Sequence, residues 1–247
     1  MSGVFPIPER LPVRINPCPV VEAIFEIRFN STVPWINMPG MLFAKIKDRY
    51  PLQKQLPLAQ VPEELRRAPH LANLPLVQYM SDKFLVQTGP RIVGLATKAN
   101  EYPGWSAIAT ELQWLIDRMK EAEIVSEIER IGVRYIDFFK GDLFDHLLLS
   151  VRVQDKVLGG HDCNFATVLR DDKLTVRLSV ANSAIVEFNG VPQTGSVLDV
   201  DAWFGALDSD VFENGLLRFE EAHKKIKELF FGLLKPDFLA TLNPVYE

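Results

Sequence analysis

Cysteine is scarce in this chain, whose 247 residues include only two, Cys18 and Cys163. Two cysteines so far apart cannot build the dense disulfide framework of a small secreted domain. The first residues also lack the basic segment and apolar run of a secretory signal. No stretch approaches the roughly 18–20 apolar residues that a membrane helix needs. We therefore expect a soluble, cytoplasmic protein that does not enter a membrane.

The chain also lacks an excess of basic residues. The chain has 27 Lys and Arg against 32 Asp and Glu, which gives a net charge of -5 at pH 7. Proteins that bind nucleic acid without sequence preference usually carry a basic excess, because Lys and Arg displace the counterions of the phosphates. The overall charge counts against such a binder, while a local basic patch stays open as an alternative.

The motifs of several common chemistries are missing. The sequence contains no Gly-rich phosphate loop between a strand and a helix, no Cys-x-x-Cys pair, no His-Glu-x-x-His motif and no Gly-x-Ser-x-Gly elbow. We therefore expect no cofactor, no metal site and no catalytic set of these kinds. A non-catalytic role is favoured over an enzymatic one.

Proline and apolar periodicity divide the chain into an arm and two halves. Residues 1–19 contain five prolines, which favours an extended N-terminal arm. Residues 20–126 and 127–247 then each have the pattern of an α+β half. Residues 51–74 contain several prolines and little periodicity. We interpret them as a long irregular connection that either hides a short element or forms a functional surface.

Periodicity also predicts the individual elements of the two halves. Residues 143–153 fit either a helix or a short helix that runs into a strand. Strands are expected at 20–29, 76–80, 83–87, 91–96, 127–139, 164–170, 174–181, 184–188 and 196–203, and helices at 38–50, from Trp105 onward, and at 212–234.

The order of these elements repeats along the chain. Each half consists of a strand, a helix, three or four further strands and a long helix. Two such units side by side would form one wide, mostly antiparallel sheet with helices on one face, which is the arrangement of the TATA-binding-protein-like fold. We therefore predict an α+β fold built from a duplicated strand–helix–strands–helix unit.

Charged residues occupy the alternate positions of the two opening strands. Glu22 and Glu26 of the first strand align with Arg130 and Arg134 of the later one, and Arg28 lies on the same face. If the strands are neighbours, opposite charges can pair across the sheet. Two interpretations stay open for these five residues. They form either a solvated polar face or a recognition surface.

Several other polar residues have both a structural and a chemical interpretation. The run His161-Asp162-Cys163 contains a base, an acid and a thiol, but neighbouring residues of an extended chain point to opposite faces. Asp142 with Asp145-His146 offers metal donors, and a turn or a helix N-terminus also explains them. His223 fits a helix flank in contact with the sheet. Trp105 fits a core anchor at a helix start or a stacking platform.

Three segments carry a resemblance to a known family. They are Pro19–Phe29 (PVVEAIFEIRF), Tyr102–Trp105 (YPGW) and Ile128–Asp137 (IERIGVRYID). Together with a closing helix near the C-terminus, they resemble a sporadically distributed, uncharacterised prokaryotic family of similar size, over nearly the whole chain. RIGVRYI is the most specific piece, and such a family usually has Asn where this chain has Asp137. The resemblance implies no established activity, and its patchy distribution is like that of mobile defence or toxin–antitoxin modules.

Three functional hypotheses follow. The first is a non-catalytic protein-interaction module, the partner or neutralising component of a prokaryotic defence or toxin–antitoxin type system. It rests on the missing catalytic motifs, the proline-rich arm and the connection at 51–74. Its partner would be another protein, and the sequence leaves the oligomeric state open.

The other two hypotheses use particular side chains. A nucleic-acid or nucleotide binder would use Arg28, Arg130 and Arg134 on an open sheet face. An enzyme with a non-standard site would use Asp137, Asp142 and His146.

Overall fold

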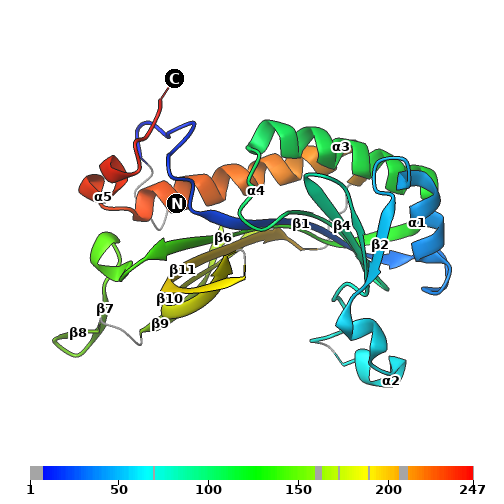
Figure 1. The fold of residues 1–247 in the computed structure, drawn as a ribbon, viewed down its shortest axis with the longest axis horizontal. Coiled ribbons are helices and arrows are strands. Elements are labelled where there is room, and N and C mark those ends of the chain that lie inside the picture. Colours follow the sequence, from blue (N-terminus) through cyan, green and yellow to red (C-terminus); the bar gives the residue numbers. More distant parts are fainter. Residues whose placement is uncertain are drawn as a thin grey trace. The chain divides into compact units, whose positions relative to one another are not determined.

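The computed structural model describes residues 8–68, 70–158, 163–171, 173–188, 190–205 and 211–246. It has an α+β fold in which helices pack on a nine-stranded antiparallel sheet (Figure 1). None of the helices in these residues is long and apolar enough to cross a membrane. The strands are β1 (Val20–Ser31), β2 (Leu52–Gln55), β3 (Val77–Met80), β4 (Phe84–Gly89), β5 (Ile92–Thr97), β6 (Val125–Lys140), β7 (Val151–Val153), β8 (Lys156–Leu158), β9 (Asn164–Asp171), β10 (Leu174–Phe188) and β11 (Val191–Phe204). The helices are α1 (Met38–Ile46), η1 (Pro57–Gln60), α2 (Glu63–Arg66), α3 (Trp105–Ala122), η2 (Phe144–His146), α4 (Val211–Leu233) and α5 (Pro236–Thr241).

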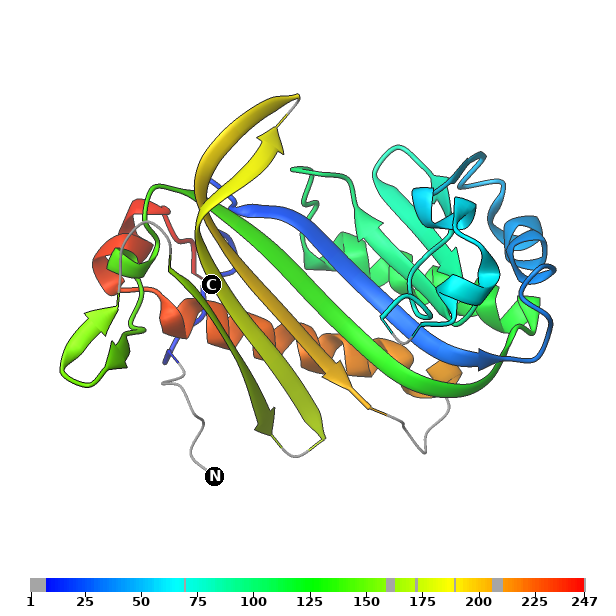
Figure 2. The same ribbon diagram turned by 90° about the horizontal axis from the view of Figure 1, so that it is seen from below.

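The strand order in the large sheet is β2-β3-β4-β5-β1-β6-β11-β10-β9. Strands β1 and β6, which open the two halves of the sequence, are hydrogen-bonded neighbours, and Figure 2 shows them running side by side. Strands β7 and β8 form a separate hairpin. The predicted α+β class with a mostly antiparallel sheet is therefore confirmed.

The chain divides into two compact units. One comprises residues 1–22, 134–202 and 221–247, and the other comprises residues 23–133 and 203–220. The division cuts through strands β1, β6 and β11 and through helix α4. Each unit therefore takes segments from both sequence halves. The arm at 1–19 and the halves at 20–126 and 127–247 stay a prediction.

The core of the 23–133 unit is built on one face of β1. Its alternate residues Ala23, Phe25, Ile27 and Phe29 are buried, as the period-two pattern predicted. The Phe25 ring contacts Trp105 of α3 and Phe219 of α4, with ring centroids 6.0 and 6.2 Å apart. Both helices thus cover the same sheet face, and Figure 1 shows α3 lying along it.

The core of the second unit is likewise built on one face of a strand, here β6, against a helix. Tyr135 contacts His223 of α4, and Phe139 stacks on Phe230 of the same helix with ring centroids 6.4 Å apart. Aliphatic residues of β10 and β11 complete this core. They are Val176, Leu178, Val180, Leu198 and Val200. The long C-terminal helix predicted at 212–234 is confirmed as α4, and it ends just before Lys235-Pro236.

The first helix is shorter than predicted. The periodicity suggested a helix over 38–50, but α1 ends at Ile46 and residues 47–49 form a turn. A residue that precedes proline avoids the helical conformation, so Pro51 disfavours a helix that continues to Tyr50. Tyr50 is still buried, because its ring stacks against Trp114 of α3.

The connection at 51–74 is not irregular throughout. It contains β2, η1 and α2, and β2 pairs antiparallel with β3 at the sheet edge. All four residues of β2 are exposed. A strand with no buried face leaves no apolar alternation, which is why periodicity missed it.

Two strands predicted at 174–181 and 184–188 are one strand. β10 continues through Asn182 and Ser183, although Ser183 has a φ of 57° in the left-handed region. Asn and Ser favour turns, so the sequence suggested a break there. Asn182 is instead buried. The ambiguous segment at 143–153 forms η2 followed later by β7.

The described part of the N-terminal arm is tied to the C-terminal segment. The Val13 amide donates to the Val245 carbonyl, and the Val245 amide donates to the Arg14 carbonyl, both at 2.8 Å. Residues 1–7 of the predicted arm lie outside the described residues.

Removal of the Phe25 ring is expected to destabilise the protein strongly. Phe25→Ala would leave a cavity beneath α3 and α4 and lower the free energy of unfolding by about 3–5 kcal/mol. Urea denaturation followed by circular dichroism measures this loss. The control Ile185→Ala removes a side chain that is 73% exposed and should change stability by no more than about 0.5 kcal/mol. Equal losses in the two variants would contradict this account of the core.

Candidate functional site

Glu26 forms the centre of a charged cluster on the sheet face opposite the helices. Its Oε1 atom lies 2.7 Å from Nη2 of Arg28 and 3.1 Å from Nε of Arg130. The Glu26 and Arg130 side chains are each only 16% exposed. An opposite-charge contact between the first strand and β6, which the sequence pattern predicted, is thus present for Glu26 and Arg130.

The Arg130 guanidinium is also held by an aromatic ring and a glycine. It lies over the Trp203 ring, 4.5 Å from the centroid. A Cβ atom placed on Gly132 would lie only 3.0 Å from Arg130 Nε, closer than nearly all real contacts. Gly132 lies two residues further along the same face of the strand. Because it has no side chain, the Arg130 guanidinium can occupy the space beside it. No pattern in the sequence identified Trp203 as the ring beneath Arg130.

A second cluster, not predicted from the sequence, belongs to the same unit. Arg91 Nη2 donates to Asn30 Oδ1 at 3.0 Å and also forms an ion pair with Glu129. Asn30 Nδ2 in turn donates to Glu127 at 3.1 Å. Arg91 directly follows the turn at Gly89-Pro90. The sequence predicts that turn, but no pattern in it identifies Asn30 or Glu129 as the partners of Arg91.

Arg134 lies in the other unit, and its ion-pair partner comes from β11. Its Nε and Nη2 atoms donate to the two carboxylate oxygens of Asp199, each at 2.8 Å. This bidentate bond raises the pKa of Arg134. Burial raises the pKa of Glu22, while nearby Arg134 acts in the opposite direction. Asp199 and Asp201 flank buried Val200 on β11, an alternation that could have identified them as residues of the polar face.

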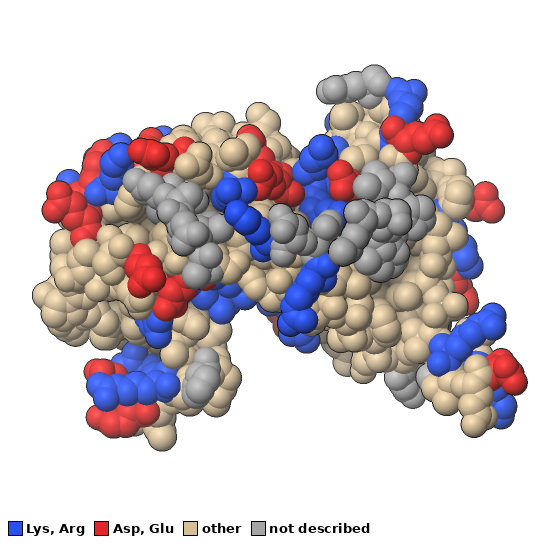
Figure 3. Space-filling model, turned by 180° about the vertical axis from the view of Figure 1, so that it is seen from behind, with Lys and Arg blue, Asp and Glu red and all other residues tan. Residues whose placement is uncertain are grey.

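The five residues proposed as a binding site therefore fall into two groups. In one unit Glu26 contacts both Arg28 and Arg130, while in the other the charge of Arg134 lowers the pKa of Glu22 against the effect of burial. Each of the three arginines has a carboxylate beside it. A phosphate group would have to displace these carboxylates, which weakens the case for nucleic-acid binding. Side chains of both charges are also interspersed over the surface shown in Figure 3.

Asp137 on β6 is a buried acid, with a relative exposure of 3%. Burial raises its pKa to about 8, and the charge of Asp199 acts in the same direction. Asp137 is therefore largely protonated at pH 7. A protonated carboxyl donates one hydrogen bond and accepts others, much as the amide of Asn does.

The other residues considered for an enzymatic site have structural contacts. Asp142 Oδ1 accepts a hydrogen bond at 2.8 Å from the Phe144 amide at the start of η2. It also accepts from Asn182 Nδ2. The His146 ring stacks on Phe238, with the ring centroids 4.2 Å apart. His161 and Asp162 lie outside the described residues.

His223 is buried against the sheet. Its Nδ1 atom lies 2.9 Å from the Tyr135 hydroxyl. Burial, together with the nearby charge of Lys227, lowers the pKa of His223 to about 4. The ring is thus neutral at pH 7, consistent with a helix-flank histidine that contacts the sheet.

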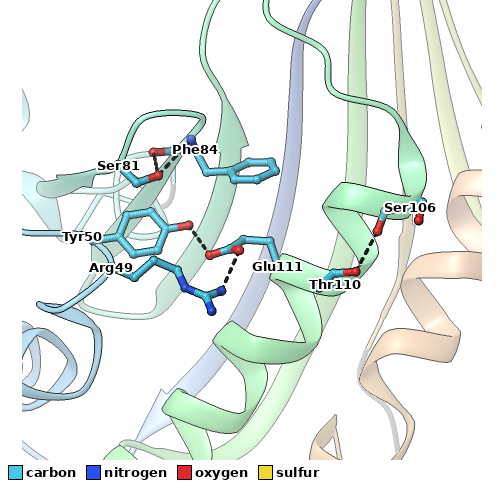
Figure 4. A network of polar contacts seen from close by, with 7 residues as sticks. All are labelled: Arg49, Tyr50, Ser81, Phe84, Ser106, Thr110 and Glu111. Atoms are coloured by element: carbon cyan, nitrogen blue, oxygen red, sulfur yellow. Dashed lines mark hydrogen bonds and ion pairs between the residues drawn. The ribbon is translucent and has the colours of Figure 1, made fainter.

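Glu111 of α3 organises a polar cluster that the sequence did not reveal (Figure 4). It accepts hydrogen bonds from the Tyr50 hydroxyl and from Arg49 Nη1, both at 2.8 Å. The Arg49 guanidinium lies 4.1 Å from the centroid of Trp114. Burial and the Glu111 carboxylate raise the pKa of Tyr50. The cluster fastens the chain that follows α1 onto α3.

Within the described residues, no group of three or more His, Cys, Asp and Glu side chains is placed to hold a metal ion. No protein-family model matches the chain, and no curated protein matches it. The residues themselves therefore carry the functional argument.

Loss of the Glu26 charge should destabilise the sheet face. Glu26→Gln would remove the carboxylate charge that Arg28 and Arg130 both contact, at an expected cost of about 1–3 kcal/mol in the free energy of unfolding. Urea denaturation measures this cost. The control Arg67→Gln breaks an exposed pair with Glu63 and should have no measurable effect. An unchanged stability of Glu26→Gln would show that the cluster is not stabilising.

Asp137→Asn should change the pH dependence of stability. The unfolded carboxyl ionises near pH 3.8, whereas the native one keeps its proton up to about pH 8. Ionisation therefore favours the unfolded chain as the pH rises through this window, by up to about 1.4 kcal/mol per pH unit. The variant cannot ionise, so its stability relative to the natural protein should rise between pH 5 and pH 7.5 in denaturation experiments. Parallel pH dependences of the two proteins would contradict the raised pKa.

Proposed function

We propose that this protein is a non-catalytic protein-interaction module. Its binding surface would be formed by Trp35, Ile36, Leu65 and Arg66, here called the connection surface. The observation that carries the proposal is the exposure of apolar side chains there, because Ile36 is 77% and Leu65 62% exposed. The Arg66 guanidinium lies 6.0 Å from the centroid of the Trp35 ring, which brings the two segments together.

The connection surface is ordered by local contacts rather than by packing. Neither η1 nor α2 has a buried residue. Arg66 Nε donates to the Val61 carbonyl at 2.8 Å, and Arg67 pairs with Glu63 one turn away. Leu65 therefore adds nothing to the core of its own unit. Apolar side chains displayed by an ordered loop, with charged residues around them, are typical of protein-binding sites.

The residue types also fit a protein partner. Trp and Arg are enriched among the residues that contribute most to protein–protein binding. The charged sheet face is less suited to this role, because Arg28, Arg130 and Arg134 already have carboxylate partners. A partner would gain more from covering the exposed Ile36 and Leu65.

The partner we propose is the product of a neighbouring gene. The resemblance of PVVEAIFEIRF and RIGVRYI to a patchily distributed prokaryotic family supports this choice, since defence and toxin–antitoxin modules are inherited as adjacent genes. In such a pair this protein would bind or neutralise its partner without catalysing a reaction.

We also propose that the fold is a duplication of the TATA-binding-protein-like kind. The strand order supports this, because β1 and β6 lie at its centre, followed outward by β5-β4-β3-β2 on one side and β11-β10-β9 on the other. A long helix, α3 or α4, follows the strands of each half. Such a likeness would concern architecture alone and would not identify a ligand.

Binding is expected to depend on the connection surface. The protein would be co-expressed with the products of its neighbouring genes and purified through a tag. Ile36→Ser combined with Leu65→Ser should weaken binding to the co-purified product at least about tenfold in calorimetric titration. The matched control, Leu148→Ser with Ile185→Ser, also removes two exposed apolar side chains and should bind normally.

Circular dichroism would establish that both double variants are folded. Failure of the natural protein to bind any neighbouring product would overturn the choice of partner. Equal binding by both double variants would overturn the choice of surface.

A further inference from the structure

The two edge strands of the sheet differ in how they are protected. Strand β2 has four residues, includes Lys54, and lies between Pro51 and Pro57. Short length, lysine and proline are the usual means by which proteins prevent an edge strand from pairing with another chain. The free edge of β2 is therefore protected against further pairing.

Strand β9 lacks these protections. It has eight residues, contains no proline, and is uncharged from Asn164 to Leu169. Its pairing with β10 is continuous from Asn164↔Ala181 to Asp171↔Leu174, with no bulge. Over the described part of the chain, β9 has a strand neighbour on one side only. Its other side presents the backbone donors and acceptors of a regular strand.

Apolar side chains occupy both faces of β9. Phe165 and Leu169 are half-buried on the face shared with Val180 and Val176 of β10, their register partners. On the opposite face lie Ala166 and Val168, and Val168 is 48% exposed. A solvated edge strand normally alternates apolar with polar residues, so this composition indicates a covered strand.

We propose that β9 pairs with β9 of a second copy of this chain, antiparallel and about a twofold axis at Thr167. The strand sequence Asn-Phe-Ala-Thr-Val-Leu-Arg has the same pattern in both directions. It consists of a polar end, a large apolar residue, a small apolar residue, a central threonine, and then the same classes in reverse. In an antiparallel pair of identical strands, large apolar residues therefore lie opposite large ones and small apolar residues opposite small ones.

The register follows from this symmetry. With Thr167 opposite Thr167, Phe165 lies opposite Leu169 of the other copy, and Ala166 lies opposite Val168. Asn164 then faces Arg170, so no like charges meet across the pair. A shift by one residue would turn the half-buried face of one copy toward the outer face of the other. The self-complementary pattern favours a second copy over the strand of a different protein, and the inference is independent of the proposed function.

A cysteine at the twofold axis tests the pairing directly. Thr167→Cys would be made in the full chain with Cys18→Ser and Cys163→Ser, leaving one thiol. Directly opposite residues of antiparallel strands have Cα atoms about 4.5–5.5 Å apart, within the range that a disulfide spans. Mild oxidation should therefore yield a covalent dimer on a non-reducing gel. The matched control, Gln53→Cys on β2 in the same background, should give no covalent dimer on that gel.

Sedimentation velocity over a concentration series tests the dimer without a crosslink. The natural protein should dimerise, and Thr167→Asp should remain monomeric because two carboxylates would face each other on the axis. Circular dichroism of Thr167→Asp should match that of the natural protein. If that variant does not fold, the cysteine experiment still decides the matter. A natural protein that is monomeric throughout, or a dimer that Thr167→Cys does not link, would overturn the proposal.

Discussion

The central strands β1 and β6 must bury one of their faces, and the other features of the molecule depend on this constraint. Successive side chains of a strand point to opposite faces, so burial of Phe25 and Tyr135 beneath helices turns Glu26 and Arg130 to the uncovered face. Charges that lie this close to a sheet lose part of their hydration. They are retained only with partners, which explains why carboxylates and guanidinium groups alternate there.

Two solutions to the cost of burying a polar group occur in this protein. On the uncovered sheet face, Arg130 and Arg134 form ion pairs with Glu26 and Asp199. Beneath the covering elements, Asp137 and His223 lose their charge instead, since burial raises the pKa of the acid and lowers that of the histidine. The residues with the most unusual titration are therefore parts of the packed interior. The connection surface and strand β9 expose apolar side chains instead, and both proposed interactions rest on them.

Elements that bury one face could be predicted from the sequence. The alternation in β1 and β6 and the apolar stripes of α3 and α4 arise because a strand repeats every two residues and a helix about every 3.6. Elements without a buried face were missed, as β2 was, because nothing in their composition records the pairing. The charged residues of the site were also visible, since Glu26 and Arg130 interrupt the apolar pattern at regular intervals.

The sequence by itself determined which apolar residues of the periodic strands and helices enter the core, because their burial depends on local periodicity. Only the tertiary structure decided which charges meet. Asp199 lies 65 residues from Arg134 along the chain, and Trp203 reaches Arg130 only through the order of the strands. The shift in the pKa of Asp137 is likewise a property of its surroundings rather than of its neighbours in sequence. A contact between distant segments leaves no local pattern in the sequence. Many carboxylates could pair with the same guanidinium, so its sequence neighbours do not show which one does.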